Sequence, residues 1–294
     1  MYRKTILENG IRVVTEKVPE MRSIAIGIMV DAGPQDETPE QSGLAHLVEH
    51  LIFQGTGSRD AKQIGRFMDS AGGNFGAFTT RDYTIFYATV LDDHRTYALE
   101  LLGDIFLNSI FPAESLEIEK NAILQEIELG RDSPEERLNT LLKKHSWSSH
   151  PLGRPTAGNP EILKGLTRED AIYFFYENYL PDRIIISASG NVDHDDFVAQ
   201  VRDSFWRMLG ASPPRNRPPL VHQGGVVIEH MPVSQVYFSI GLKAYPYANP
   251  DRYGMHIMNN ILGGGISSRL FRHIRDQRGM VYQIGSEYHA YRDG

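Results

Sequence analysis

Alternating apolar and polar positions at the start of the chain predict β-strands. The segment YRKTILENGIRVVTEKV holds two such runs on either side of Asn9-Gly10, a dipeptide typical of tight hairpin turns. The next run, from Ser23 to Gly33, is more continuously apolar and predicts a buried strand. We therefore expect a hairpin followed by a strand of the core.

Apolar residues recur every three to four positions farther along, which predicts helices. The predicted helices cover 43–53, 60–73, 94–111, 112–147, 167–180 and 193–209. The longest is expected to break near Gly130 and Ser133-Pro134. Segments 76–91 and 183–193 are rich in β-branched or aromatic residues and predict further strands. This mixture predicts an α+β fold, in which a mixed sheet packs against helices.

A proline-rich stretch, residues 211–221, marks the clearest boundary in the chain. It contains four prolines and two arginines and resembles an interdomain linker. We expect residues 1–210 to form one domain and residues 222–294 part of a second. After the linker the order of elements restarts, with strands predicted over 225–231 and 234–245 and a helix over 253–265.

This restart suggests an internal repeat. The segments SGLAHLVEHLIFQG and YGMHIMNNILGGG align with apolar residues on apolar residues. Three polar residues of the first segment, however, fall on Ile257, Asn260 and Ile261 in the second. We therefore expect two domains of similar build, of which only the first keeps the polar residues.

The amino-acid composition excludes several kinds of binding partner and active site. The net charge of −7, without a cluster of Lys or Arg, argues against binding to nucleic acid or to an anionic membrane. The absence of cysteine excludes disulfides, thiolate nucleophiles and cysteine-based zinc sites, so a metal site must use His and carboxylates. No segment resembles a signal peptide or a membrane span, and we expect a cytoplasmic protein.

The polar residues of the first segment are His46, Glu49 and His50, which share one helix face at positions i, i+3 and i+4. Two histidines one turn apart can hold zinc, and a carboxylate beside them can act as a general base. The order H-x-x-E-H is a zinc-peptidase signature. The alternative is a solvated helix face, but the apolar residues around the motif favour a buried helix and the metal interpretation.

A third metal ligand is expected on another element. Glu126 lies among apolar residues of the helix predicted over 112–147, and Glu119 lies two turns earlier on much the same face. Glu117 and Glu128 are expected to face solvent. The local sequence leaves open the alternative that all four glutamates form a solvated stripe.

The chain resembles the inverzincin peptidase family that includes pitrilysin, insulin-degrading enzyme and the mitochondrial processing peptidase, and is most similar to its smaller bacterial members. Besides the H-x-x-E-H motif, the resemblance is carried by segments 77–87, 150–155, 188–193 and 267–286. In that family a glutamate ligand follows the motif by about 76 residues, which here selects Glu126 (126 − 50 = 76). The resemblance implies that His46, His50 and Glu126 bind one Zn²⁺ per chain, with Glu119 supporting the ligands.

The resemblance also implies roles in substrate binding and catalysis. Glu49 would be the catalytic base, and an edge strand through Ala77, Phe78 and Thr79 would bind the substrate as an added strand. Gly76 departs from the asparagine usual at that place.

The second domain of such proteins contributes an arginine and a tyrosine seven residues apart, which Arg275 and Tyr282 match (282 − 275 = 7). They would bind the substrate and stabilise the oxyanion of the tetrahedral intermediate. Their local sequence alone favours a surface arginine and a core aromatic residue.

The implied function is that of a zinc-dependent metalloendopeptidase acting on extended peptides or unfolded segments, as a homodimer or heterodimer. The alternative is a non-catalytic scaffold or partner subunit, but such family members typically lose motif residues that this chain keeps. Family members run beyond 400 residues, so we expect the second domain to be incomplete here and to expose apolar surface.

Overall fold

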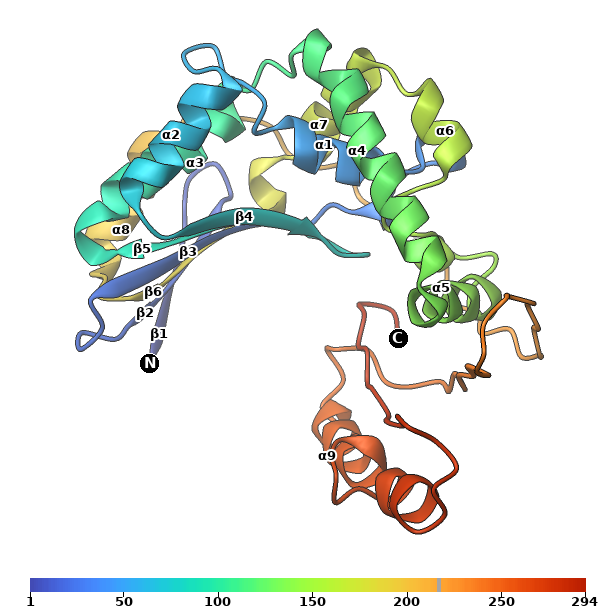
Figure 1. Cartoon of the computed structure of the whole chain (residues 1–294). Coiled ribbons are helices and arrows are strands. Elements are labelled where there is room, and N and C mark those ends of the chain that lie inside the picture. Colours follow the sequence, from blue (N-terminus) through green and yellow to red (C-terminus); the bar gives the residue numbers. More distant parts are fainter. Residues whose placement is uncertain (216–217) are drawn as a thin grey trace.

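A six-stranded mixed sheet forms the base of the N-terminal part of the molecule, residues 1–205. The computed structural model describes residues 1–215 and 218–294 (Figure 1). The strands are β1 (Tyr2–Ile6), β2 (Arg12–Lys17), β3 (Ser23–Val30), β4 (Asn74–Thr79), β5 (Thr84–Leu91) and β6 (Ile184–Gly190). Their order is β1-β2-β6-β3-β5-β4, and only β2 and β6 pair in parallel. The predicted hairpin is confirmed as β1 and β2.

Helices lie over one face of this sheet and beyond the ends of its strands (Figure 1). They are α1 (Leu44–Leu51), α2 (Ala61–Ala71), α3 (Arg95–Asn108), α4 (Ala113–Asp132), α5 (Pro134–Ser146), α6 (Pro160–Gly165), α7 (Arg168–Asn178) and α8 (His194–Phe205). The predicted break in the long helix is confirmed, because Ser133 ends α4 and caps α5 by accepting a hydrogen bond from the Glu136 N–H. Helix α6 was not predicted, although Asn159 before Pro160 is a capping signal.

Alternating side chains divide the sheet into a buried and an open face. On the helix side, Ile26, Phe86 and Ile186 are buried in the core. On the other side, Gly27 and Ser187 border a shallow hollow of about 430 Å³. The mixed sheet covered by helices confirms the α+β class. No helix in the described part of the chain combines the length and apolar character needed to span a bilayer.

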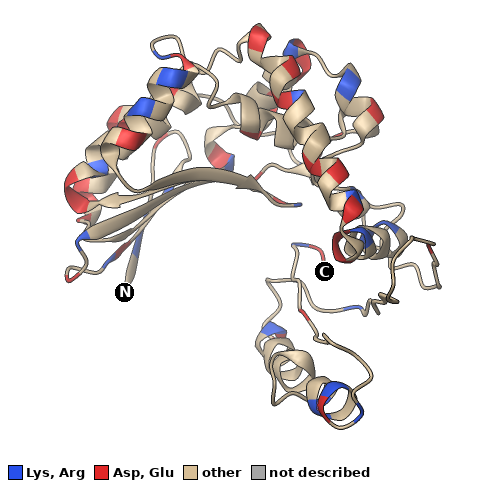
Figure 2. Ribbon diagram, viewed as in Figure 1, with Lys and Arg blue, Asp and Glu red and all other residues tan. Residues whose placement is uncertain are grey.

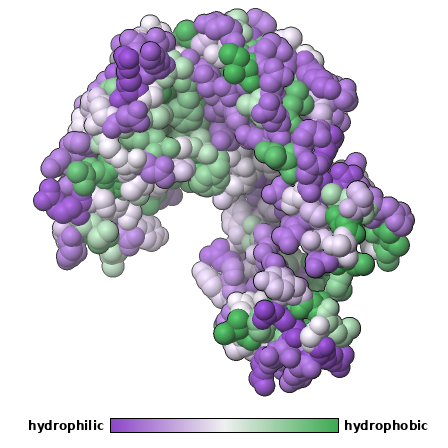
Figure 3. Space-filling model, viewed as in Figure 1, coloured by the Kyte–Doolittle hydropathy of each residue, from purple (hydrophilic) through white to green (hydrophobic). Residues whose placement is uncertain are grey.

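The C-terminal part, residues 218–294, contains α9 (Arg252–Gly263) and a short π-helix (Phe271–Asp276). The strands predicted over 225–231 and 234–245 are wrong, because these residues form no ladder. A strand needs a partner to satisfy its backbone, and no described segment pairs with either one. Their alternating apolar side chains are exposed instead, as at Phe238 and Ile240. Figure 3 shows such hydrophobic side chains on the outside of this part of the molecule.

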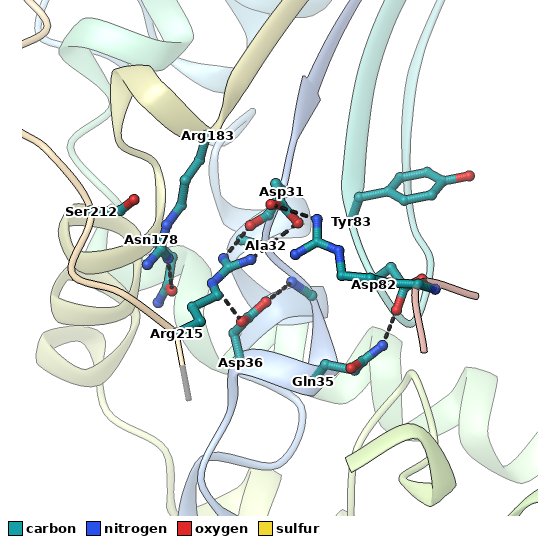
Figure 4. A network of polar contacts seen from close by, with 12 residues as sticks. Asp31, Ala32, Gln35, Asp36, Asp82, Tyr83, Asn178, Arg183, Ser212 and Arg215 are labelled. Carbon is teal, nitrogen blue, oxygen red and sulfur yellow. Dashed lines mark hydrogen bonds and ion pairs between the residues drawn. The ribbon is translucent and has the colours of Figure 1, made fainter. Parts of the chain in front are cut away.

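Ion pairs hold the segment after α8 against the N-terminal part (Figure 4). The Arg215 guanidinium lies 3.1 Å from an Asp31 carboxylate oxygen and 3.0 Å from an Asp36 oxygen. Arg292, near the end of the chain, pairs with Asp31 at 2.8 Å. Residues 216–217 of the predicted linker (211–221) lie outside the described residues.

Candidate metal centre

Helix α1 carries the H-x-x-E-H motif in the interior of the N-terminal part. Its apolar side chains are buried, and the helix packs against α4, α7 and β4. Gly43 precedes it with a left-handed backbone (φ 106°), a conformation that favours glycine. A β-carbon on Gly158 would lie 2.4 Å from the Gly43 Cα, so a second glycine is required where the two backbones meet. The buried helix predicted from its apolar residues is confirmed.

His46, His50 and Glu126 come together between α1 and α4. The His46 Nε2 lies 3.7 Å from Glu126 Oε2, and the His50 Nε2 lies 3.8 Å from Glu126 Oε1. One donor atom from each residue lies within 4.8 Å of the other two, and no other such cluster of three occurs among the described residues. Tetrahedral zinc with bonds of about 2.0–2.1 Å separates its ligand atoms by roughly 3.3 Å. The donor set therefore fits a zinc ion after small side-chain adjustments.

Glu119 fixes the orientation of one of these histidines. Its Oε2 lies 2.9 Å from the His50 Nδ1, on the ring edge opposite the nitrogen that faces Glu126. A carboxylate here holds the proton on Nδ1 and leaves Nε2 free as a donor to a metal. The seven-residue spacing from Glu119 to Glu126 thus brings both side chains to the same histidine.

The electrostatics of the cluster suit a cation. Burial lowers the pKa of His46 to about 4, and the neighbouring His50 adds to this effect. The neutral imidazole that results at neutral pH is the form that binds metals. Acidic side chains also predominate along α4, beside the cluster (Figure 2). Their negative potential favours a positively charged ligand.

Glu49 lies next to the donor set without belonging to it. Its side chain is buried, and its Oε2 accepts a hydrogen bond from the Thr79 hydroxyl at 2.5 Å. Burial raises the pKa of Glu49, while the hydrogen bond from Thr79 and the nearby His50 oppose this rise. A carboxyl whose pKa is raised holds a proton more strongly and is therefore a better general base.

Strand β4 is an edge of the sheet and runs beside α1. It contains Ala77, Phe78 and Thr79, and Phe78 is exposed. Gly76 faces Tyr87 across the strand pair, and a β-carbon on Gly76 would lie 2.7 Å from the Tyr87 hydroxyl. The tyrosine ring therefore occupies the space that an asparagine side chain at position 76 would need.

Arg275 and Tyr282 lie in the C-terminal part and contact each other. The Arg275 Nε donates a hydrogen bond to the Tyr282 carbonyl at 2.8 Å, and its guanidinium stacks on the ring of Phe271. Tyr282 is 83% exposed and does not lie in a core. No hydrogen bond, ion pair or ring contact between described residues joins either residue to the donor cluster.

One residue of this region had no signal in the sequence. Glu37 lies in the segment PQDETPEQSG, which reads as a polar loop, yet only 4% of it is exposed. Its carboxyl contacts the start of α1. An acid in a polar segment normally faces solvent, so its burial follows from tertiary structure alone.

Family models divide the chain into two matched regions. The model for insulinase, peptidase family M16, matches residues 12–160, and the model for the peptidase M16 inactive domain matches residues 165–294. The relative called uncharacterized zinc protease YmxG, from Bacillus subtilis, is 34% identical over the whole chain and 71% of its own length. A Mycobacterium leprae relative, called uncharacterized zinc protease ML0855, is also 34% identical, over 99% of this chain and 66% of its own.

Solved structures show the same fold. A protease from Helicobacter pylori superimposes with a TM-score of 0.88 at 19% identity, over 100% of this chain and 72% of its own. The peptidase M16 inactive domain from Pseudomonas fluorescens superimposes with a TM-score of 0.85 at 19% identity, over 99% of this chain and 71% of its own. At this level of identity the likeness concerns the fold alone.

Proposed function

Because the chain belongs to peptidase family M16, we propose that it is a zinc-dependent metalloendopeptidase that hydrolyses peptide bonds in extended peptides or unfolded segments. The observation that carries this proposal is the cluster of His46, His50 and Glu126 beside the buried Glu49. The relatives are called zinc proteases, which supports a peptidase and zinc as its metal.

His46, His50 and Glu126 would hold one zinc ion per chain. Such an ion, when bound, supplies Lewis-acid activation of the peptide carbonyl and of water. Glu119 would keep the His50 ring in the orientation that directs Nε2 toward the metal.

Glu49 would act as the general base and then as the general acid. It would accept a proton from the attacking water and pass it to the amine that leaves. The Thr79 hydroxyl, 2.5 Å from the Glu49 Oε2, orients the carboxyl for this exchange. Burial supports the role, because it raises the pKa of the Glu49 carboxyl and so makes the carboxylate a stronger base.

The edge strand β4 would bind the substrate. A peptide in extended form can add to the free edge at Ala77, Phe78 and Thr79 through main-chain hydrogen bonds. Because Thr79 also contacts Glu49, a peptide held there would lie near the base. Arg275 and Tyr282 would bind the substrate and stabilise the oxyanion from the C-terminal part.

The alternative is a non-catalytic scaffold or partner subunit of a processing-peptidase-like complex. The match of residues 165–294 to a domain called inactive is the observation that favours it. The intact H-x-x-E-H motif and the gathered donor set favour catalysis. We also propose that the protein is cytoplasmic, as expected from its sequence. The family resemblance further supports the proposal that it forms a homodimer or heterodimer.

Zinc content and peptide cleavage test the proposal together. Wild type and Glu49→Gln should each bind one zinc ion, whereas cleavage of a quenched fluorescent peptide should fall by about 10²–10⁴-fold in the variant. Equal cleavage by both proteins would exclude Glu49 as the base. Zinc binding without any cleavage by wild type would favour the scaffold, and a protein that binds no zinc would refute the metal site.

A further inference from the structure

The N-terminal turn of α1 is capped by a residue outside the helix. Glu37 Oε1 accepts a hydrogen bond from the Ala45 N–H at 2.8 Å, and its Oε2 accepts one from the Gly43 N–H at 3.1 Å. The first N–H groups of any helix have no partner within the helix. Gly43, which precedes the first turn, has no side chain to satisfy them, so Glu37 does so from six residues upstream.

This cap lies directly beside the first proposed metal ligand. Ala45, which donates to Glu37, precedes His46, the third residue of α1. The helix has only eight residues, and isolated helices of this length are unstable in water. Its position therefore depends on contacts made by its ends and faces. A shift of the first turn would move His46 more than His50, which lies one turn farther along.

Two arginines that have no role in the proposed mechanism connect Glu37 to neighbouring segments. The Arg154 guanidinium, in the segment HPLGRP, donates a hydrogen bond to the Glu37 carbonyl. The Arg81 guanidinium, in the turn after β4, donates to the carbonyls of Leu152 (2.6 Å) and Arg154. These contacts connect the end of the edge strand to the start of the metal-binding helix.

We propose that Glu37 is a positioning residue of the metal centre, which fixes the first turn of α1 and thereby the place of His46 relative to His50 and Glu126. Glu37 touches none of these side chains and would act through the backbone of Gly43 and Ala45. The inference rests on the proposed function, since it assumes that the three residues bind zinc.

Substitutions of Glu37 should weaken zinc binding in a graded way. Glu37→Gln keeps one carbonyl acceptor but turns an amide N–H₂, which cannot accept, toward the other backbone donor, where a carboxyl group keeps an oxygen whether or not it is protonated. Glu37→Ala removes both acceptors. Losing a residue that supports metal ligands typically lowers metal affinity by about 10–100-fold, and we expect the glutamine variant near the lower limit and the alanine variant near the upper one. The KM for a peptide, measured at saturating zinc, should stay unchanged.

Asp193 offers a matched control. It also accepts hydrogen bonds from two backbone N–H groups, those of Asp195 and Asp196, at the start of α8. Helix α8 carries none of the proposed site residues. Asp193→Ala should therefore remove a helix cap and leave the zinc affinity unchanged.

Zinc affinity of the full chain would be measured by competition with a chromophoric chelator, beside thermal unfolding of the zinc-free proteins. Reduced affinity in both Glu37 variants, with wild-type affinity in Asp193→Ala, would support the inference. Wild-type affinity in folded Glu37→Gln would overturn it, even if Glu37→Ala fails to fold. A wild type that binds zinc but cleaves no peptide would refute the peptidase and leave the affinity comparison decisive for Glu37.

Discussion

Glu37, at the start of α1, and Glu49, within α1, are both buried carboxyl groups, but they have different partners. Glu49 accepts a hydrogen bond from a side chain, the Thr79 hydroxyl, whereas Glu37 accepts its hydrogen bonds from the backbone. Burial raises the pKa of Glu37 to about 8, and the two N–H donors and the charge of Arg154 reduce this rise without cancelling it. Because its ordinary pKa is 4.5, Glu37 binds a proton more tightly in the folded than in the unfolded protein.

This difference predicts a pH-dependent stability. The contribution of the Glu37 proton to the free energy of unfolding is complete below pH 4.5 and is lost as the pH rises toward 8. The reason is that Glu37 in the unfolded chain then gives up a proton that Glu37 in the folded protein retains. Relative to Glu37→Gln, the free energy of unfolding of wild type should fall by about 3 kcal/mol between pH 4.5 and 7. Denaturant unfolding of the zinc-free proteins across this range measures it. A constant difference between the two proteins would contradict the assignment.

The helices and strands show which features the sequence alone predicts and which depend on contacts with other segments. Helix α1 was predicted as buried because apolar residues surround its polar face, and it is. The spacing of Glu119 and Glu126 placed both on one face of α4, but nothing local showed that this face is turned toward α1. Only the family resemblance selected Glu126. The strands predicted over 225–231 and 234–245 failed for a related reason, because a strand depends on a partner that its own residues do not specify.

Strand β4 provides a test of packing between elements. Gly76→Asn would place a β-carbon 2.7 Å from the Tyr87 hydroxyl, so the ring must move. Overpacking of this kind typically costs about 1–3 kcal/mol in the free energy of unfolding. Combining the change with Tyr87→Ser should recover much of that cost. Gly65→Asn in α2 is the control, because a β-carbon there meets nothing within 4 Å.

Denaturant unfolding of the variants at positions 76, 87 and 65 measures these costs. The Gly65→Asn variant should unfold like wild type, since asparagine and glycine differ little in helix propensity. Two results would contradict this explanation: a Gly76→Asn variant as stable as wild type, or a double variant with Tyr87→Ser that regains none of the lost free energy of unfolding. Either would show that the Tyr87 ring does not require glycine at position 76.

The described ion pairs that attach the residues after α8 to the N-terminal part differ in burial. Arg215 is 17% exposed and pairs with Asp31 and Asp36 in the loop after β3 (Figure 4). Asp36 is followed directly by Glu37, so this pair attaches the segment after α8 to the loop that caps α1. Two other pairs are more exposed. Arg292 also pairs with Asp31, and its side chain is 39% exposed, while Arg137 of α5 pairs with Glu229 and is 38% exposed. Buried pairs depend less on solvent screening, so the first connection should be the stronger.

Replacing Arg215 or Arg137 by alanine compares the most buried of these connections with an exposed one. Arg215→Ala removes the ion pairs with Asp31 and Asp36 and a hydrogen bond from the charged guanidinium to the Asp31 carbonyl. A hydrogen bond of a charged group is worth about 1.5–3 kcal/mol, and the free energy of unfolding should fall by that order. Arg137→Ala should cost about 1 kcal/mol or less, as exposed pairs do. Subtilisin should also cut within 211–221 faster in Arg215→Ala than in wild type, since that segment loses its attachment. Equal cleavage rates in Arg215→Ala and wild type would show that Arg215 does not hold the linker, and the pairs of Arg292 with Asp31 and of Arg137 with Glu229 would then be the described ion pairs that attach the C-terminal part.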